Sequence, residues 1–260
     1  MTNILLTGAS RGIGAAALAV LEAAGATVAG HASRDSSAFL GSDLAEPGAG
    51  DRLWDAALNR LDGRIDVLIN NAGVFEDAPL DGPDAEWAAT WERSWRINLQ
   101  AAADLSRRAV LHFQKRAKSN EASANERTSG DAGRARAASL PPVTGRIVNV
   151  SSRAAFRGDS PAHWHYAAAK AGMVAMTRTI ARAYAADGIL AFVVAPGFVM
   201  TGMAEEYLAS RGGAKVLADI PLGRVAAAAE VAETIRWLAL DAPPSLTGAV
   251  LDVNGASYVR

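Results

Sequence analysis

The stretch "NILLTGASRGIG" at residues 3–14 decides how this chain folds. It opens with the short apolar run "NILL", typical of a buried strand, and then turns through Gly8, Gly12 and Gly14 into an alanine-rich segment. Glycine lets the backbone turn tightly and approach a ligand, and a helix that begins there presents unpaired N–H groups. The stretch therefore predicts a strand, a turn and a helix around a pyrophosphate group.

The glycine spacing is G-x-x-x-G-x-G and not the usual G-x-G-x-x-G of dinucleotide-binding turns. A glycine-rich turn alone is weak evidence, because a plain strand-to-helix turn has a similar composition. Here the strand, the turn and the helix follow in the required order, which favours a nucleotide site.

Short apolar runs alternate with alanine-rich segments through most of the chain. The predicted strands are "NILLTG", "ATVAGH", "IDVLINNAG", "GRIVNVSS", "GILAFVVAPG" and "GAVLDVNG", and the predicted helices span 12–24, 50–61, 84–113, 163–186 and 229–240. We expect an α/β fold, a doubly wound parallel sheet of about seven strands that is Rossmann-like, with helices on both faces.

Composition narrows the classes of protein. The chain has 260 residues, half of them hydrophobic, so we expect one domain over 1–260. A net charge of −1 makes nucleic acid and membrane unlikely partners. The absence of cysteine excludes disulfides and thiolate metal sites and fits a cytoplasmic location. No basic segment followed by a long apolar run opens the sequence, so we expect a soluble protein without a secretion signal.

Residues 117–143 break the alternation. They contain no aromatic residue, and Leu140 and Val143 are their only large aliphatic residues. Such a segment buries little, so we predict a mobile insertion. It follows a helix that leads back to the start of a strand, and we expect it opposite the carboxyl ends of the strands, where ligands bind.

The residues after the second predicted strand bear on cofactor choice. If that strand ends near His31, Ser33 and Arg34 follow, and Arg34 with Arg11 in the glycine turn would suit the 2′-phosphate of NADP. Asp35 keeps NAD open, because a carboxylate there can accept the ribose hydroxyls. A third interpretation is that Arg34 and Asp35 are only a solvated loop.

The segment "HYAAAK" at 165–170 places Tyr166 four positions before Lys170, on the same face of a helix. Free tyrosine titrates near ~10, and catalysis near neutrality needs a pKa roughly 3 units lower, about 4 kcal/mol. An ammonium about 4 Å away at an effective dielectric constant of about 20 supplies roughly that energy. Alone, the spacing is most often an exposed helix pair, so it needs supporting residues.

Supporting residues stand at "NVSS", where Ser151 and Ser152 end a predicted strand. A hydroxyl at the carboxyl end of a central strand can polarise a substrate carbonyl. The alternative is that the two serines cap the next element.

Together, the glycine turn, "NNAG" at 70–73, Asn98, the two serines, the tyrosine–lysine pair and "PGFVMT" at 196–201 resemble the short-chain dehydrogenase/reductase family. The resemblance runs from Thr7 to Gly255, outside 117–143, and is closest to the NADP-dependent branch that includes bacterial 3-oxoacyl-carrier-protein reductases. It implies an NAD(P)-dependent oxidoreductase that transfers hydride between nicotinamide and a carbonyl or secondary alcohol, without a metal.

The resemblance also implies four catalytic residues. Tyr166 would be the general acid/base, and Lys170 would lower its pKa and hold the nicotinamide ribose. Ser152 would bind the substrate oxygen, and Asn98 would hold a water that links Lys170 to solvent.

The same resemblance implies cofactor contacts along the chain. Asp43 would meet the adenine, "NNAG" would support the cofactor, and Thr201 would contact the carboxamide. The expected cofactor-binding residues are Gly8, Ser10, Arg11, Gly12, Ile13, Gly14, Ser33, Arg34, Asp43, Leu44, Asn71, Ala72, Gly73, Tyr166, Lys170, Pro196, Gly197, Val199 and Thr201.

Two positions depart from the family pattern. Phe192 replaces a structural asparagine, and "DVNGAS" lacks a second glycine. The resemblance further implies a homo-oligomer, a tetramer or dimer, built partly by the helices at 84–113 and 163–186.

The substrate side is less determined. Ser152, Phe156, His163, Trp164 and Phe198, with the loop from 200 to 222, are expected to surround a small-molecule carbonyl or alcohol. That set suggests an apolar or aromatic substrate, whereas Arg153 and Arg157 would suit an anionic one. His163 and His165 lie two apart and do not predict a metal site.

Trp87, Trp91 and Trp95 recur at helical spacing, which predicts a buried helix face, with an interface as the alternative. One alternative to an enzyme is a nucleotide-binding regulator of the same fold, but such proteins usually lack a catalytic side chain and none is missing here. A nucleotide-sugar epimerase or dehydratase is disfavoured, because little chain follows the "PG" turn.

Overall fold

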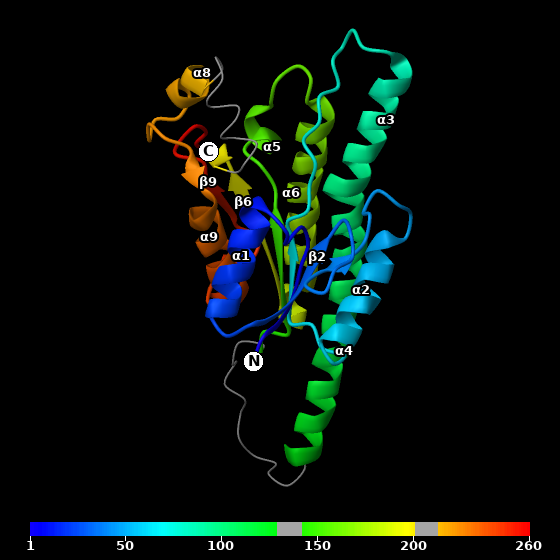
Figure 1. Ribbon diagram of the computed structural model, residues 1–260. Coiled ribbons are helices and arrows are strands. Elements are labelled where there is room, and N and C mark those ends of the chain that lie inside the picture. The colour runs from blue at the N-terminus through cyan, green and yellow to red at the C-terminus, as the bar shows by residue number, and fades with distance from the viewer. Residues whose placement is uncertain (129–141, 201–212) are drawn as a thin grey trace.

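The computed structural model describes residues 1–128, 142–200 and 213–260, and over these the strands form one main parallel sheet. Its order is β3-β2-β1-β4-β5-β6-β9, which confirms the predicted fold class (Figure 1). The strands are β1 Asn3–Leu6, β2 Thr27–Ala32, β3 Leu40–Gly41, β4 Val67–Asn70, β5 Gly145–Val150, β6 Ile189–Pro196 and β9 Val250–Val253. The order reverses between β1 and β4, which creates a crevice at their carboxyl ends.

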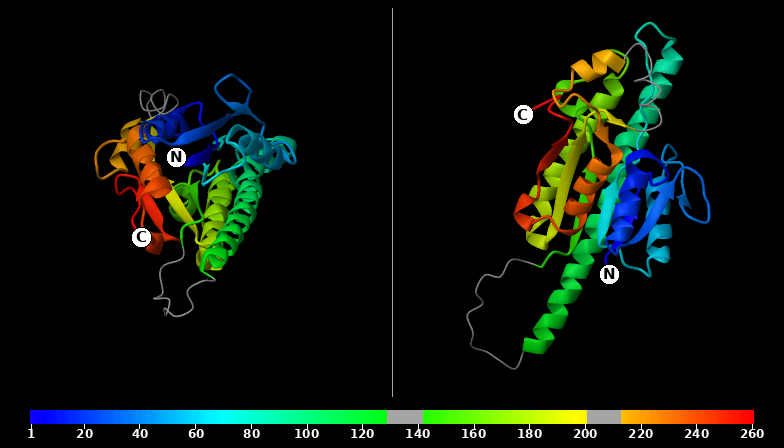
Figure 2. Two further views of the ribbon diagram at one scale, coloured as in Figure 1. Left: turned by 90° about the horizontal axis from the view of Figure 1, so that it is seen from below. Right: turned by 60° about the vertical axis from the view of Figure 1, so that its left-hand side comes forward.

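Helices cover both faces of this sheet. The helices α1 (Gly12–Ala23) and α9 (Ala228–Leu240) pack on one face, and α2 (Ala49–Arg60), α4 (Ala101–Thr128) and α6 (Trp164–Tyr184) pack on the other. The end-on view in Figure 2 separates these two layers. None of the described helices is long and apolar enough to cross a membrane.

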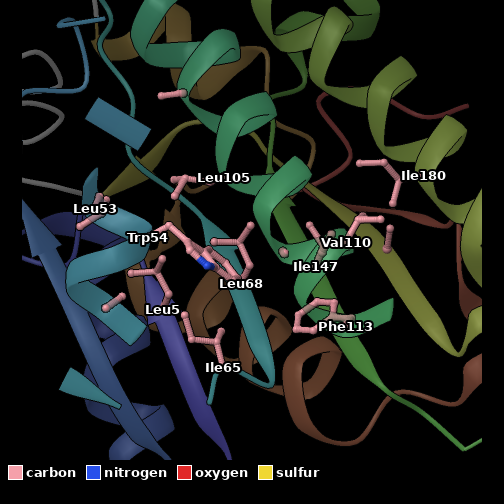
Figure 3. Close-up of a cluster of buried hydrophobic side chains, with 14 of the residues drawn as sticks. Leu5, Leu53, Trp54, Ile65, Leu68, Leu105, Val110, Phe113, Ile147 and Ile180 are labelled. Carbon is pink, nitrogen blue, oxygen red and sulfur yellow. The ribbon is translucent and has the colours of Figure 1, made fainter. Parts of the chain in front are cut away.

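Successive strand residues point to opposite faces, so each strand contributes to two cores. Leu5, Leu68 and Ile147 pack with Trp54 and Phe113 on the α2–α4 side, as Figure 3 shows. The neighbouring residues of the same strands pack against α1 and α9 instead. This two-sided burial explains why the strands are continuous apolar runs and not alternating ones.

The structure corrects several predicted boundaries. The predicted helix at 84–113 is divided into α3 (Asp84–Trp95), the π-helical turn η1 (Arg96–Gln100) and α4. The structure adds the short strands β3, β7 (Val199–Met200) and β8 (Ala226–Ala227). It also adds the helices α5 (Ala154–Arg157) and α8 (Gly213–Ala218) and the 3₁₀ turns Ala185–Asp187 and Pro244–Leu246. Elements this short leave almost no periodic signal in a sequence.

The start of the predicted insertion is also corrected. Helix α4 continues to Thr128, through the first part of 117–143, because alanine, glutamate, lysine and arginine in that part favour a helix. Residues 129–141 lie outside the described residues. The end of α4 projects on the side of the molecule where the strands begin (Figure 1).

The prediction that Trp87, Trp91 and Trp95 form a buried face is wrong. Trp95 is 46% exposed, Trp87 and Trp91 are partly exposed, and together they line an open surface groove. Ser94 is the buried residue of α3. A helix that packs on one side only must expose its other side, and the sequence does not state which side that is.

The structure shows where the two residues that depart from the family pattern, Phe192 and Ala256, lie. Phe192 is fully buried on β6, within the core against α9. Ala256, where a second glycine is common, is exposed and has a φ of +63°, in the left-handed region. A Cβ in that region is crowded by the following carbonyl oxygen.

Replacing Ala256 with glycine should therefore raise the free energy of unfolding by about 1 kcal/mol, because glycine has no Cβ to strain. Urea denaturation followed by circular dichroism measures this difference. The matched control is Ala19→Gly on the exposed side of α1, which should lower the free energy of unfolding by about 1 kcal/mol. Destabilisation by both substitutions would contradict the strain at Ala256.

Candidate cofactor-binding and catalytic site

The turn between β1 and α1 closes only because three of its residues lack side chains. Gly8 and Gly12 have φ values of +66° and +55°. A Cβ on Gly14 would lie 1.9 Å from the Gly8 carbonyl oxygen. Helix α1 starts at this turn with neither a side-chain cap nor an acidic residue in its first turn, so its N-terminus suits an anion.

Hydrogen bonds join this turn to the segment after β4. Thr7 Oγ1 accepts from the backbone N–H groups of Asn71 and Ala72 at 2.9 and 3.0 Å. Asn71 Nδ2 donates to the carbonyl oxygens of Thr7 and Gly8 at 3.0 and 3.1 Å. Asn71 and Ala72 were expected here, but Thr7 was not. A buried hydroxyl at the end of a strand was the available signal.

The end of β2 lies one residue later than expected, at Ala32. Ser33 and Arg34 follow and are exposed, as are Ser10 and Arg11 in the glycine turn, while Ile13 packs against the core under α1. Asp35 Oδ1 accepts a hydrogen bond from the Gly41 N–H at 3.1 Å, so one of its two carboxylate oxygens already has a partner within the protein.

Asp43 and Leu44 follow β3, the strand that pairs with β2. Asp43 is exposed, and its Oδ1 accepts from the Ala45 N–H at 3.0 Å. Leu44 is buried in the core. At the other side, Pro196 ends β6, Gly197 N–H donates to the Val253 carbonyl, and Val199 is buried. Thr201 lies outside the described residues.

Tyr166 and Lys170 share one face of α6, as their spacing predicted. The Lys170 ammonium nitrogen Nζ lies 5.8 Å from the centroid of the Tyr166 ring and donates to the Val150 carbonyl at 2.9 Å. Lys170 is buried beneath the tyrosine, so the pair lies inside the site and not on an open helix surface.

The expected lowering of the tyrosine pKa is wrong for this arrangement. Burial raises the pKa of Tyr166 to about 12, opposed by a hydrogen bond with Ser152. Burial also lowers the pKa of Lys170 to about 8. Desolvation penalises both the phenolate and the ammonium, and spacing along the helix does not reveal it.

Ser151 and Ser152 have different partners. Ser151 Oγ donates to the Lys170 carbonyl at 2.9 Å and joins the end of β5 to α6. Ser152 Oγ pairs with Tyr166 and also accepts from the Ala154 N–H at 3.1 Å. The bond with Ala154 agrees with the capping interpretation of Ser152, and the catalytic interpretation stays a prediction.

Asn98 lies fully buried in the π-helical turn η1. Its Nδ2 donates to the Val74 carbonyl at 3.0 Å and to Ser94 Oγ at 2.9 Å, and its Oδ1 accepts from the Val74 N–H at 3.0 Å. A Cβ on Gly73 would lie 2.8 Å from Asn98 Oδ1 and 3.5 Å from Lys170 Nζ. The π turn, a feature frequent at functional sites, thus brings Asn98 close to Lys170 through Gly73.

An aromatic wall stands beside Tyr166. Phe75 is 48% exposed, stacks on His163 with ring centroids 3.7 Å apart, and meets Tyr166 edge-on at 4.9 Å. His163 is held by Ser160 Oγ at 2.6 Å and by Asp77 at 3.2 Å. Phe75 was missed by sequence reasoning, because a single aromatic residue in a loop carries no periodic signal.

The other residues expected around the substrate point in several directions. Trp164 packs edge-on against Trp87 of α3, and Phe156 stacks on Tyr258. Phe198 lies under the Arg153 guanidinium at 4.8 Å. Both Arg153 and Arg157 pair with Asp219, so one carboxylate serves two cations.

His163 and His165 lie with their ring centroids 6.2 Å apart. Within the described parts of the chain, no group of three or more histidine, cysteine, aspartate or glutamate side chains could hold a metal ion.

A doubly wound parallel sheet with a glycine turn at its switch point is the architecture of dinucleotide-binding proteins. The chain belongs to the short-chain dehydrogenase/reductase family. The family model described as short chain dehydrogenase matches residues 2–121, and the one described as Enoyl-(Acyl carrier protein) reductase matches residues 128–256. The family that the motifs predicted is thereby confirmed.

Individual relatives cover nearly the whole chain. The chain is 33% identical to the 3-oxoacyl-[acyl-carrier-protein] reductase FabG of Escherichia coli, over 98% of its own length and 96% of the relative's. It is also 33% identical to FabG of Thermotoga maritima, over 98% and 97%. The corresponding reductase of Synechocystis is 32% identical over 96% and 94%.

Proposed function

We propose that this protein is an NADP-preferring ketoreductase or alcohol dehydrogenase in which Tyr166 is the general acid/base. The observation that carries the proposal is the grouping of Tyr166, the Ser152 hydroxyl and the buried Lys170 amine at the carboxyl edge of the sheet. The glycine turn opens onto the same edge, where a cofactor and a substrate can meet.

The residues present fit a nicotinamide dinucleotide. Gly14 lies so close to Gly8 that there is no room for a Cβ, so these two positions offer a ligand only backbone groups at the start of α1. When bound, it supplies or accepts the hydride. The Tyr166 hydroxyl donates a proton to the substrate oxygen in the reductive direction and takes it back in the oxidative one. Without substrate, the hydrogen bond of Ser152 to Tyr166 opposes the rise in the tyrosine pKa. With substrate bound, the single Ser152 hydroxyl hydrogen is donated to the substrate oxygen instead.

Lys170 and Asn98 complete the path for the proton. Burial brings the pKa of the Lys170 amine to about 8, so it exchanges a proton readily near neutral pH. The proposed route runs from Tyr166 towards Lys170 and, through a water near Asn98, to solvent. Gly73 keeps the space between Asn98 and Lys170 open.

The substrate class is a carbonyl compound or a secondary alcohol. Because the relatives named above act on 3-oxoacyl groups, a 3-oxoacyl thioester is the first substrate to test. Phe75 and His163 form an aromatic wall next to Tyr166, and the exposed ring of Phe75 favours a substrate with an acyl chain over a small charged one.

A non-catalytic nucleotide-binding regulator remains the alternative, but all four expected catalytic side chains are present. Cytoplasmic location also stays a prediction from the sequence.

Replacing Tyr166 with phenylalanine should lower kcat by about 10²–10⁴-fold, because the proton donor is lost while the ring remains. The loss of NADPH absorbance in the presence of a 3-oxoacyl thioester measures kcat. Fluorescence titration should give an unchanged Kd for NADPH. The control is Tyr184→Phe at the end of α6, which should retain full activity. Undiminished turnover in the Tyr166 variant would overturn the proposed mechanism.

NADP preference is proposed from the charges around the end of β2. Arg11 and Arg34 are exposed and form no ion pair within residues 1–128, 142–200 and 213–260. Asp35, which would favour NAD, already accepts from Gly41. Two available cations and a partly occupied carboxylate favour binding of a 2′-phosphate.

Replacing Arg34 with alanine should weaken NADPH binding by about tenfold and leave NADH binding within about twofold, because only NADPH carries the phosphate. Fluorescence titration of both cofactors gives the two Kd values. Asp35→Asn serves as the control and should not reverse the preference. Tighter binding of NADH by the unsubstituted protein would contradict NADP preference.

We also propose that the protein is a homo-oligomer, a tetramer or dimer, that uses α3 and α6. Trp87, Trp91 and Trp95 form a partly exposed row along α3, and the exposed Trp164 of α6 extends it through its contact with Trp87. A continuous aromatic surface of this kind is typical of protein interfaces.

Replacing Trp95 with glutamate should therefore shift the protein towards smaller species, because a charge would be buried against a second copy. Light scattering coupled to size-exclusion chromatography measures the mass. The control is Leu217→Glu on α8, an exposed apolar residue away from α3, which should leave the mass unchanged. A monomeric mass for the unsubstituted protein would contradict the proposed assembly.

A further inference from the structure

His31 connects two parts of the cofactor edge that are distant in sequence. Its side chain is 3% exposed and lies between the glycine turn and the residues after β3. Nδ1 accepts a hydrogen bond from the Gly8 N–H at 3.2 Å, and Nε2 lies 2.9 Å from the Ser42 carbonyl oxygen. The backbone carbonyl of His31 also accepts from the Ala9 N–H at 2.8 Å.

These partners define one protonation state. The Gly8 N–H can only donate and the Ser42 carbonyl can only accept, so both are satisfied by a neutral ring with its hydrogen on Nε2. A protonated ring would present a second N–H to the Gly8 N–H and lose that bond. Burial lowers the pKa of His31, and the bond to Ser42 opposes this only in part.

The contact has consequences at both ends of a bound dinucleotide. Gly8 is held on its other side by Asn71, which donates to the Gly8 carbonyl at 3.1 Å. Ser42 directly precedes Asp43 and Leu44, the residues expected at the adenine. The His31 ring therefore spans from the backbone of the pyrophosphate turn to the backbone of the adenine segment.

We propose that neutral His31 is a positioning residue for the dinucleotide, holding the glycine turn and the Ser42–Leu44 segment at a fixed separation. This role rests on the cofactor site of the proposed function. The residue acts through backbone groups and does not touch the reacting atoms, so it governs cofactor affinity and leaves the chemical step unaffected.

Several elements next to His31 carry charged residues. The segments next to it carry Arg11 in the glycine turn, Arg34 and Asp35 after β2, and Asp43 after Ser42, all of them exposed. The helices packed on β2 carry Glu22 on α1, and Asp51, Arg52 and Asp55 on α2. Burial, and not any of these charges, is the largest influence on the ring.

The direction of the pH dependence follows from the neutral ring. The pKa of His31 in the folded protein lies below the ordinary value of 6.5, and the state proposed to bind the dinucleotide is the one with the neutral ring, which accepts from the Gly8 N–H. Affinity is therefore constant above that ordinary value. It falls as the pH drops through the folded pKa, by up to about tenfold per pH unit.

The test compares NADP⁺ binding by the unsubstituted protein, His31→Gln and His31→Leu, from about pH 8 to about pH 5. Glutamine keeps an acceptor for Gly8 and a donor for Ser42 but does not titrate. The oxidised cofactor is used because the reduced one decomposes in acid. Its 2′-phosphate titrates equally with every protein, so the difference between the proteins is the measured quantity.

We expect the affinity of the unsubstituted protein to fall more steeply below the ordinary histidine pKa than that of His31→Gln. His31→Leu should bind about tenfold more weakly at all pH values, because Gly8 and Ser42 lose their partner. Its kcat at saturating cofactor should stay within about twofold of the unsubstituted value, with the loss confined to the KM for cofactor. Thermal unfolding confirms that each variant is folded.

Parallel pH profiles for the unsubstituted protein and His31→Gln would overturn the role of His31 and leave the proposed function intact. So would unchanged affinity in folded His31→Leu. A folded unsubstituted protein that binds neither NADP⁺ nor NAD⁺ at neutral pH would overturn the proposed function itself, and the positioning role with it.

Discussion

The close approach of the turn after β1 to the segment after β4 is the constraint on which the rest of the site depends. Gly8, Gly14 and Asn71 are so close there that a Cβ on either glycine would overlap its neighbours. Thr7 and Asn71 exchange four hydrogen bonds across this junction with backbone groups on the other side. The junction lies where the strand order reverses, so it shapes the crevice in which a dinucleotide binds.

A second set of buried polar contacts connects β4 and β5 to α6, the helix that carries Tyr166. Asn70 of β4 donates to Asn149 of β5 at 2.8 Å, and Asn149 donates to Thr177 of α6 at 2.7 Å. Ser151 then holds the Lys170 carbonyl. Buried polar groups are costly when unpaired, so these bonds allow few alternative positions for α6 against the sheet. The location of Tyr166 is thereby tied to the strands that form the crevice.

Burial sets the electrostatics of this region more than charge pairing does. It raises the pKa of Tyr166, lowers the pKa of Lys170 and lowers the pKa of His31. Each group is consequently held in its neutral form more strongly than in water. The ring of His31 can therefore serve as a neutral connector.

The sequence by itself determined the class of fold, the strand and helix order, and the set of expected site residues. Buried strands, glycine turns and i, i+4 pairs are local patterns that can be recognised in the sequence alone. Only the tertiary structure decided which face of α3 is exposed, where Phe75 lies against Tyr166, and that His31 joins Gly8 to Ser42. It also reversed the expected pKa shift of Tyr166, because desolvation depends on every element packed around a group, and sequence spacing does not record that packing.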